Sequence, residues 1–406
     1  MAAGARSCLR SPPLGGVPGS RCPMPRPRRE PRIPFLPVDA GRRSHGRRRA
    51  SRRRTTPAVD CHMITPHIIA MSETTREPRR AMNLQMGTVQ TATELHLTGG
   101  LRAPMQGDKL WSLGPVLDGR TVRQLSPRPI QHVAGIAAGI GGTLFGGDEM
   151  TGMETPLLSR VWTPLDGPGS GKPQPADKWG AIAGNAADAG AADYAELAGH
   201  IAFSLKAAGI RLRDASDHHH DQLMAALAEG KVSGNRFTNI PVSDMQLAFH
   251  SVLSELASAR DYLAKTLAMG LGAPPRIDAL ARLKDWLDAA SRAHLRASPI
   301  VSDMLTAYDP ASLDPWLHEL TEYRNLFLHR QPLGRRGAGW LRYEERSHDG
   351  LTIPVVTMPL ADDDLFAPGA DALLRFVGLY RKMTDLLDRG ADAAPHPSTF
   401  PHIVAE

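Results

Sequence analysis

Cysteine is scarce in this chain of 406 residues, and the three that it has, Cys8, Cys22 and Cys61, lie near its start. Residues 71–406 contain none, which excludes a disulfide framework and a thiolate metal site there. Long apolar runs are also missing. The nearest, residues 132–144, is broken by glycine and shorter than the roughly 18 residues needed to span a bilayer. These absences predict a chain that makes no membrane contact, in a reducing, cytoplasmic setting.

Acidic residues are rare at the start of the chain. Residues 1–70 hold 15 Arg, no Lys and three acidic residues, a net charge of +12, whereas the whole chain carries +6. The rest is therefore mildly acidic. Residues 1–81, rich in Arg, Pro and Ser, predict a disordered tail, because they offer too little apolar surface to offset chain entropy. The Arg runs 47–49 and 52–54 suit nucleic acid or a targeting signal. A start of translation at Met63, Met71 or Met82 is the alternative.

Residues 82–240 predict an irregular to helical region of unknown role. A short strand is indicated near residues 93–97, and two glycine-containing fragments, at 139–142 and 171–172, lack the spacing of a phosphate-binding loop. Helical periodicity covers residues 194–205, ending near Gly209, and returns over 223–227, ending at Gly230. Between them, residues 217–221 read Asp-His-His-His-Asp. Adjacent helical residues point about 100° apart, so the three histidines cannot share one metal, and a solvated N-terminal turn is favoured.

The C-terminal half predicts four long helices. Their expected ranges are 243–270, 275–297, 313–332 and a fourth around residues 373–390, while 340–344 and 352–358 flank the turn signal Asp349-Gly350. Short links between antiparallel helices are typical of bundles. The fold class expected is therefore mainly α, with an antiparallel four-helix bundle over residues 241–392, a possible β-hairpin insertion and a flexible tail at 393–406.

The third of these helices carries an unusual cation. Its apolar stripe comprises Trp316, Leu317, Leu320, Tyr323, Phe327 and Leu328. Arg324 falls within that stripe, where a guanidinium is costly unless an anion pairs with it. Asn325 and His329 follow one turn apart along the edge of the stripe. The three polar residues are therefore expected to face solvent or a partner.

The string Arg324-Asn325-Leu326-Phe327-Leu328-His329 resembles the Arg-x4-His motif of the HEPN superfamily (higher eukaryote and prokaryote nucleotide-binding domains), in which a polar residue follows the Arg. Residues 254–263 are similar to the first helix of such domains. The resemblance covers residues 241–390. It implies a homodimeric, metal-independent endoribonuclease with no cofactor, in which Arg324, Asn325 and His329 are catalytic.

The chemistry of these side chains suits that reaction. When the 2′-hydroxyl of RNA attacks the adjacent phosphate, histidine can move the proton and arginine can stabilise the phosphorane. Asn325 would bond the phosphate or orient the His329 ring. Arg330, Arg335 and Arg336, just after the motif, suit the RNA backbone.

Two alternatives stay open. Arg324 could pair with a buried carboxylate such as Glu255, and His329 could be present only because its cation suits the C-terminal helix dipole. The chain would then be a non-catalytic dimer that binds a nucleotide or a partner. One such role is a toxin-antitoxin component paired with a nucleotidyltransferase or another antitoxin, in a defence system.

Overall fold

The computed structural model describes residues 90–152, 158–164, 173–329, 333, 340–360, 364 and 366–399, all within one compact unit of the chain. The expected disordered tail, residues 1–81, and residues 400–406 lie outside the described residues. None of the described helices is long and apolar enough to cross a membrane.

The first half of the described chain forms a six-stranded antiparallel sheet. In spatial order its strands are β6 (Arg128–Pro129), β3 (Leu110–Trp111), β2 (Arg102–Gln106), β1 (Gln90–Leu97), β7 (Leu144–Gly152) and β8 (Leu158–Pro164). The strand expected near residues 93–97 is thus confirmed as part of β1. A short helix, α1 (Ile130–Gly139), lies between β6 and β7 in the chain.

A second sheet contains the expected hairpin. Its order is β5 (Thr121–Arg123), β4 (Val116–Asp118), β11 (Leu351–Thr357), β10 (Leu341–His348) and β9 (Arg236–Phe237). Asp349 and Gly350 both have positive φ, as a two-residue hairpin turn requires. In β10 the buried Leu341 and Tyr343 alternate with outward residues, which matches the strand period of two.

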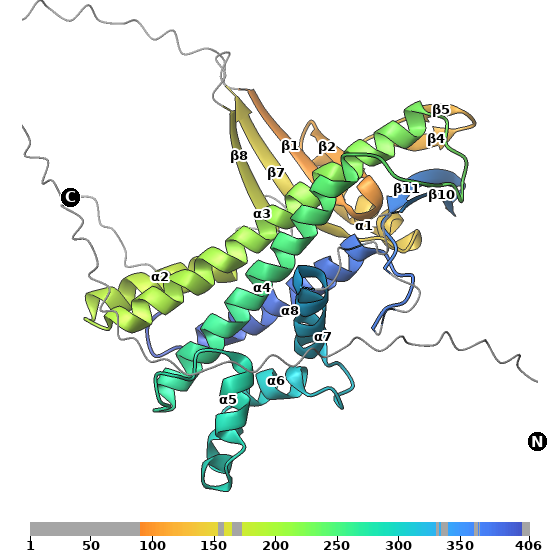
Figure 1. The fold of residues 1–406 in the computed structure, drawn as a ribbon. Helices are drawn as coiled ribbons and strands as arrows, with labels where there is room; N and C mark the ends of the chain where they lie inside the picture. The colour runs from red at the N-terminus through yellow and green to blue at the C-terminus, as the bar shows by residue number, and fades with distance from the viewer. Residues whose placement is uncertain are drawn as a thin grey trace, which may run out of the picture. The chain divides into compact units, whose positions relative to one another are not determined.

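The remaining described helices are α2 (Pro175–Asp188), α3 (Ala192–Ala228), α4 (Val242–Gly270), α5 (Leu280–Leu287), α6 (Pro299–Tyr308), α7 (Trp316–His329) and α8 (Ala372–Asp392), with 3-10 turns at η1 (Thr98–Gly100) and η2 (Ala290–Ala297). Helix α3 contacts both sheets, whereas α5 and α6 lie away from them (Figure 1). The long helices α3 and α4 run side by side, and α3 also contacts β1 and β8 of the first sheet and β11 of the second. The helix expected over 275–297 is divided into α5 and η2.

The expected four-helix bundle is wrong. The described chain is a mixed α/β fold, in which the supposed hairpin insertion is the centre of a sheet that takes strands from residues 116–123, 236–237 and 341–357. The hairpin of β10 and β11 has two free edges that can form hydrogen bonds. Strands distant in the sequence, β9 and β4, pair with those edges. Local periodicity identifies helices and hairpins, but it does not reveal such long-range partners.

Helix α3 corrects a second expectation. Two helices and a solvated turn were expected over residues 194–230, whereas α3 is continuous for 37 residues. Gly209 lies within it, and a Cβ there would come 2.9 Å from the Tyr380 hydroxyl. The glycine therefore permits close packing against α8 and does not end the helix.

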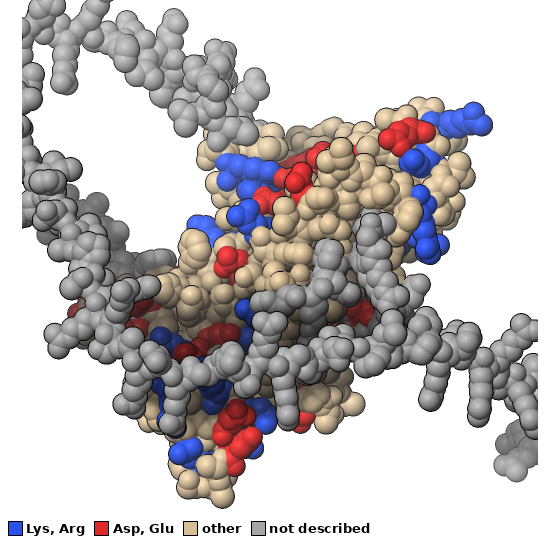
Figure 2. Space-filling view, in the orientation of Figure 1, with Lys and Arg blue, Asp and Glu red and all other residues tan. Residues whose placement is uncertain are grey.

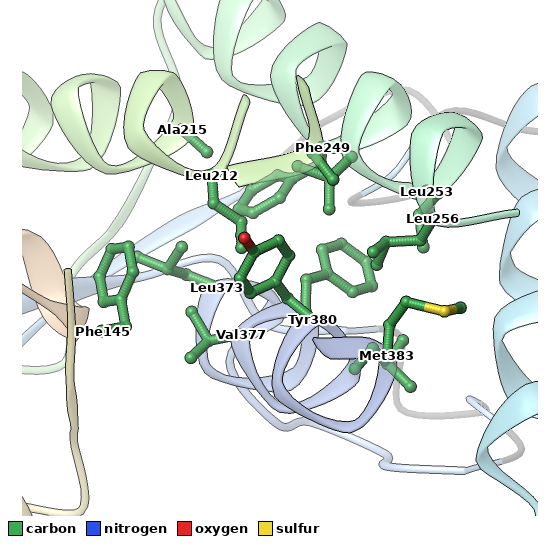
Figure 3. Packing of buried hydrophobic residues seen from close by; sticks show 14 of the residues in the cluster. Phe145, Leu212, Ala215, Phe249, Leu253, Leu256, Leu373, Val377, Tyr380 and Met383 are labelled. Atoms are coloured by element: carbon green, nitrogen blue, oxygen red, sulfur yellow. The ribbon is translucent and has the colours of Figure 1, made fainter. Parts of the chain in front are cut away.

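The core lies where α3, α4 and α8 meet (Figure 3). Leu212 of α3, Phe249 and Leu256 of α4, and Tyr380 of α8 are all buried, and Phe249 contacts Phe376 edge to face. Phe145 of β7 also belongs to this cluster, so sheet and helices share one core. Burial of these apolar side chains stabilises the positions of the first sheet and of α7, which both contribute residues to the same cluster.

Candidate functional site

The predicted site lies on α7, which contacts α4, α6 and α8. Its stripe is buried as expected at Trp316, Leu317, Leu320, Tyr323 and Phe327. Leu328 is only half-buried. Asp314, just before α7, accepts from Lys382 Nζ of α8 at 2.6 Å.

Arg324 and Asn325 are half-buried at the margin of this stripe. Arg324 Nη1 donates to Asn325 Oδ1 over 3.3 Å. The structure thus brings these two predicted residues together on one edge of α7, between the buried face and solvent. Neither residue is sealed in the core.

The remaining predicted residues are only partly described. His329 is the last residue of α7, and its side chain lies outside the description. Arg330, Arg335 and Arg336, the expected RNA-backbone contacts, lie outside the described residues. On the face of the molecule shown in Figure 2, Lys and Arg are interspersed with Asp and Glu wherever the surface is not covered by grey residues.

A buried ion pair joins α7 to α8. Glu319, 2% exposed, accepts from Arg375 of α8 through both carboxylate oxygens. Burial raises the pKa of Glu319, and the Arg375 charge opposes that rise. Glu255, suggested as a partner for Arg324, is half-buried on α4. Glu319 is thus a buried carboxylate of α7, and it binds Arg375 of α8.

A second imidazole lies near the C-terminal half of α7. His250 of α4 stacks on Phe327, with ring centroids 6.3 Å apart and an interplanar angle of 7°. Its Nε2 accepts from the Leu333 backbone N–H at 3.4 Å. Burial lowers the pKa of His250, so its ring is neutral at pH 7.

A separate cluster of buried charges lies between the first sheet and α3, and sequence reasoning missed it. It comprises Glu94 and His96 of β1, Arg102 of β2, Asp148 of β7, Arg160 of β8 and Asp217 of α3. We call these six residues the sheet cluster. Strand register explains why four of them meet: Glu94 lies opposite Asp148, and His96 lies opposite Arg102.

Arginine bonds connect the sheet cluster. Arg160 donates to Asp148 Oδ2, and its Nη1 lies 2.8 Å from Asp217 Oδ2. Arg102 Nη2 donates to Asp217 Oδ1 at 2.9 Å, and its Nε lies 3.4 Å from Glu94. Although burial by itself raises the pKa of Asp148, its contacts with His96 and Arg160 hold that pKa below its ordinary value.

His96 is completely buried in the sheet cluster, beneath the ring of Trp162, whose centroid is 4.9 Å away. Gly146 lies opposite His96 on β7, and a Cβ there would come within 2.3 Å of the Trp162 ring. Burial first, and then the Arg102 charge, lower the pKa of His96 to about 4, although Asp148 opposes the shift. The imidazole is therefore neutral at pH 7.

The sheet cluster borders two cavities. One, of about 360 Å³, is lined by Arg160 and Trp162 together with Arg213, Tyr380 and other residues of β8, α2, α3 and α8. Another, of about 400 Å³, is lined by Glu94, Arg102, residues 114–115 and residues of β5 and α3. Three of the six residues, Arg160 in the first cavity and Glu94 and Arg102 in the second, thus line a cavity.

The expectation of a solvated turn at residues 217–221 is wrong. Asp217 joins the sheet cluster, His219 is fully buried, and His220 Nδ1 lies 2.8 Å from the Gly100 carbonyl oxygen.

The sequence signal that could have indicated the sheet cluster was the alternation of Glu94 and His96 with Leu95 and Leu97. That pattern predicts a strand with one polar face, but only α3 packing on that face makes the polar residues buried.

No family model, no curated protein and no solved structure matches this chain. The HEPN resemblance of residues 241–390 thus depends on the motif and the helices around it.

Proposed function

We propose that this protein is a metal-independent endoribonuclease whose reaction takes place at the edge of α7. His329 exchanges the proton of the attacking 2′-hydroxyl, Arg324 stabilises the phosphorane, and Asn325 bonds a phosphate oxygen or orients the imidazole. As the bond from the 2′-oxygen to phosphorus forms, the bond from phosphorus to the 5′-oxygen breaks. The 5′-oxygen takes up a proton and leaves as a hydroxyl, and the other product carries a 2′,3′-cyclic phosphate. The reaction needs no metal because the nucleophile belongs to the RNA itself.

One observation carries the proposal: Arg324 and Asn325 lie together, half-buried, at the margin of the buried face of α7. Arg324 Nη1 donates to Asn325 Oδ1 over 3.3 Å, so a guanidinium and an amide lie side by side at this margin. A half-buried guanidinium beside an amide can donate hydrogen bonds to a phosphate, and water competes with those bonds less than it does at an exposed guanidinium.

The test is cleavage of a labelled RNA by purified protein in excess EDTA, with product ends analysed for cyclic phosphate. His329→Ala and Arg324→Ala should each lower the rate at least a hundredfold, the lower end of what general acid–base or oxyanion groups contribute. His318→Ala, on the same helix, and Arg389→Ala, exposed on α8, are matched controls that should cleave like the wild type.

A second function is favoured by the departure of the helical region from the expected bundle. In that case the same edge binds a nucleotide or a partner, such as a nucleotidyltransferase, without cutting RNA. Intact RNA after incubation with folded protein, together with nucleotide or RNA binding that Arg324→Ala abolishes, would support this function over cleavage. Size-exclusion chromatography with light scattering would show whether the protein forms the expected homodimer.

A further inference from the structure

The sheet cluster contains donor atoms placed as metal ligands are. Among the described residues, His96, Asp148 and Asp217 each offer one ligand atom, and these atoms all lie within 4.8 Å of one another. His96 Nε2 and Asp148 Oδ2 are 3.0 Å apart. Two atoms at right angles around a metal ion, each about 2.1 Å from it, are separated by about 3.0 Å.

Several of these atoms lack hydrogen bonds. Within the part of the chain that the structure describes, neither ring nitrogen of the fully buried His96 has a hydrogen-bond partner, and nor does Asp148 Oδ1. If Nε2 carries no proton, its lone pair faces that of Asp148 Oδ2 across 3.0 Å. Buried ring nitrogens without a partner are costly, and a cation between His96 Nε2 and Asp148 Oδ2 would bind both atoms.

The charges point the same way. The sheet cluster has three carboxylates but only two guanidinium groups. One negative charge is therefore in excess. Neutral imidazole is also the form of histidine that binds metals.

We propose that His96, Asp148 and Asp217 form a binding site for a divalent metal ion of the Mn²⁺ class. One imidazole and two carboxylates favour a transition metal over Ca²⁺, and the absence of thiolates from the site favours Mn²⁺ or Fe²⁺ over soft-ligand metals. Trans ligands about 2.1 Å from a metal lie about 4.2 Å apart, so no pair of these atoms would need to close by more than roughly 0.6 Å.

Arg160 is the competitor for this ion. Its guanidinium binds both Asp148 and Asp217, yet its side chain is 29% exposed and lines the 360 Å³ cavity. It can leave the two carboxylates for that cavity when the ion arrives. Arg102, with a side chain only 5% exposed, stays on Asp217.

The experiment measures Mn²⁺ binding to EDTA-treated, dialysed protein by electron paramagnetic resonance of free Mn²⁺. Mn²⁺ is the probe because the cysteines and exposed histidines elsewhere in the chain attract it less than they attract Zn²⁺. The wild type should bind one ion tightly. Asp148→Asn should weaken binding at least tenfold, whereas Glu149→Gln, next to it on β7 and exposed, should not.

Arg160→Gln separates a metal site from a purely structural ion-pair network. Loss of a competing cation should strengthen Mn²⁺ binding roughly tenfold or more, because a unit charge a few ångströms from a dication is strongly repelled. A network with no room for an ion would instead lose stability in this variant and gain no affinity for Mn²⁺.

The proposal is overturned if the folded wild type binds no Mn²⁺ ion tightly, or if Asp148→Asn and Glu149→Gln bind it equally. Should Asp148→Asn fail to fold, the Arg160→Gln comparison decides the question. RNA cleavage in EDTA is scored separately, so either proposal can fail without the other.

Discussion

At the scale of single residues, the placement of polar groups depends on what covers them. His96 and Asp148 are buried by α3 and Trp162, whereas Arg324 and Asn325 stop at the margin of the α7 stripe. Histidine, for example, has different chemistry in different surroundings. A neutral imidazole under a tryptophan suits a metal ion, and an imidazole at a helix end suits proton transfer.

His250 should make stability depend on pH. Because burial lowers its pKa, the unfolded chain takes up a proton at higher pH than the folded chain does. Stability from this group is therefore present above the ordinary value of 6.5 and is lost as pH falls through it. His250→Phe keeps the stack on Phe327 and removes the titration. Urea unfolding between about pH 7 and pH 5 should give a shallower slope for this variant.

The same substitution at exposed His294 controls for the loss of one histidine. Equal slopes for His250→Phe and the wild type would mean that His250 titrates alike in the folded and unfolded chains.

At the scale of elements, the turn η1 holds the first sheet against its neighbours. Gly99 and Gly100 both have positive φ; a Cβ on Gly99 would meet Val355 of β11, and one on Gly100 would lie 2.6 Å from the His219 carbonyl oxygen of α3. Backbone cannot move aside as a flexible side chain can. This close approach is what lets α3 cover His96 and Arg102.

Gly100→Ala should therefore lower the free energy of unfolding by more than the cost of a left-handed backbone conformation at an alanine. A left-handed conformation costs a non-glycine residue about 1–2 kcal/mol, and the contact with α3 should raise the total to roughly 3 kcal/mol or more. Gly107→Ala is the matched control, since Gly107 has φ of 61° with nothing within 4 Å of its Cβ. Urea denaturation compares the two. Equal losses would show that α3 can shift away from the turn.

At the scale of the whole molecule, all of the described elements, from β1 onward, lie in one unit. That unit contains the shared core of α3, α4 and α8, and it lies within residues 81–406. The excess of Arg lies outside it, in residues 1–70, so the overall net charge of +6 says little about the folded part. Any RNA affinity of the unit must come from local groups such as Arg324.

A chain that starts at Met82 should keep the whole described fold. Its melting temperature should stay within roughly 2 °C of that of the full chain, since losing 1 kcal/mol in a domain of this size costs about 2–4 °C. Scanning calorimetry measures this. RNA affinity should fall with the loss of the Arg runs, most clearly at low salt, while cleavage by bound protein stays the same. A melting temperature lower by many degrees would mean that residues 1–81 contribute to the fold.

The sequence by itself determined the local elements of the C-terminal half. It predicted α4, α7, α8 and the hairpin of β10 and β11, because helical periodicity and an Asp-Gly turn are written in neighbouring residues. It also identified Arg324 and Asn325 as polar residues at the edge of a buried stripe.

Only the tertiary structure decided which segments are neighbours. The partners of β10 and β11, the continuity of α3 through Gly209 and the meeting of His96, Asp148 and Asp217 all join residues distant in sequence. Each segment satisfies its own periodicity without them. Strand register and helix packing, which depend on the whole chain at once, place the sheet cluster in the interior and turn a polar strand face into a buried charged site.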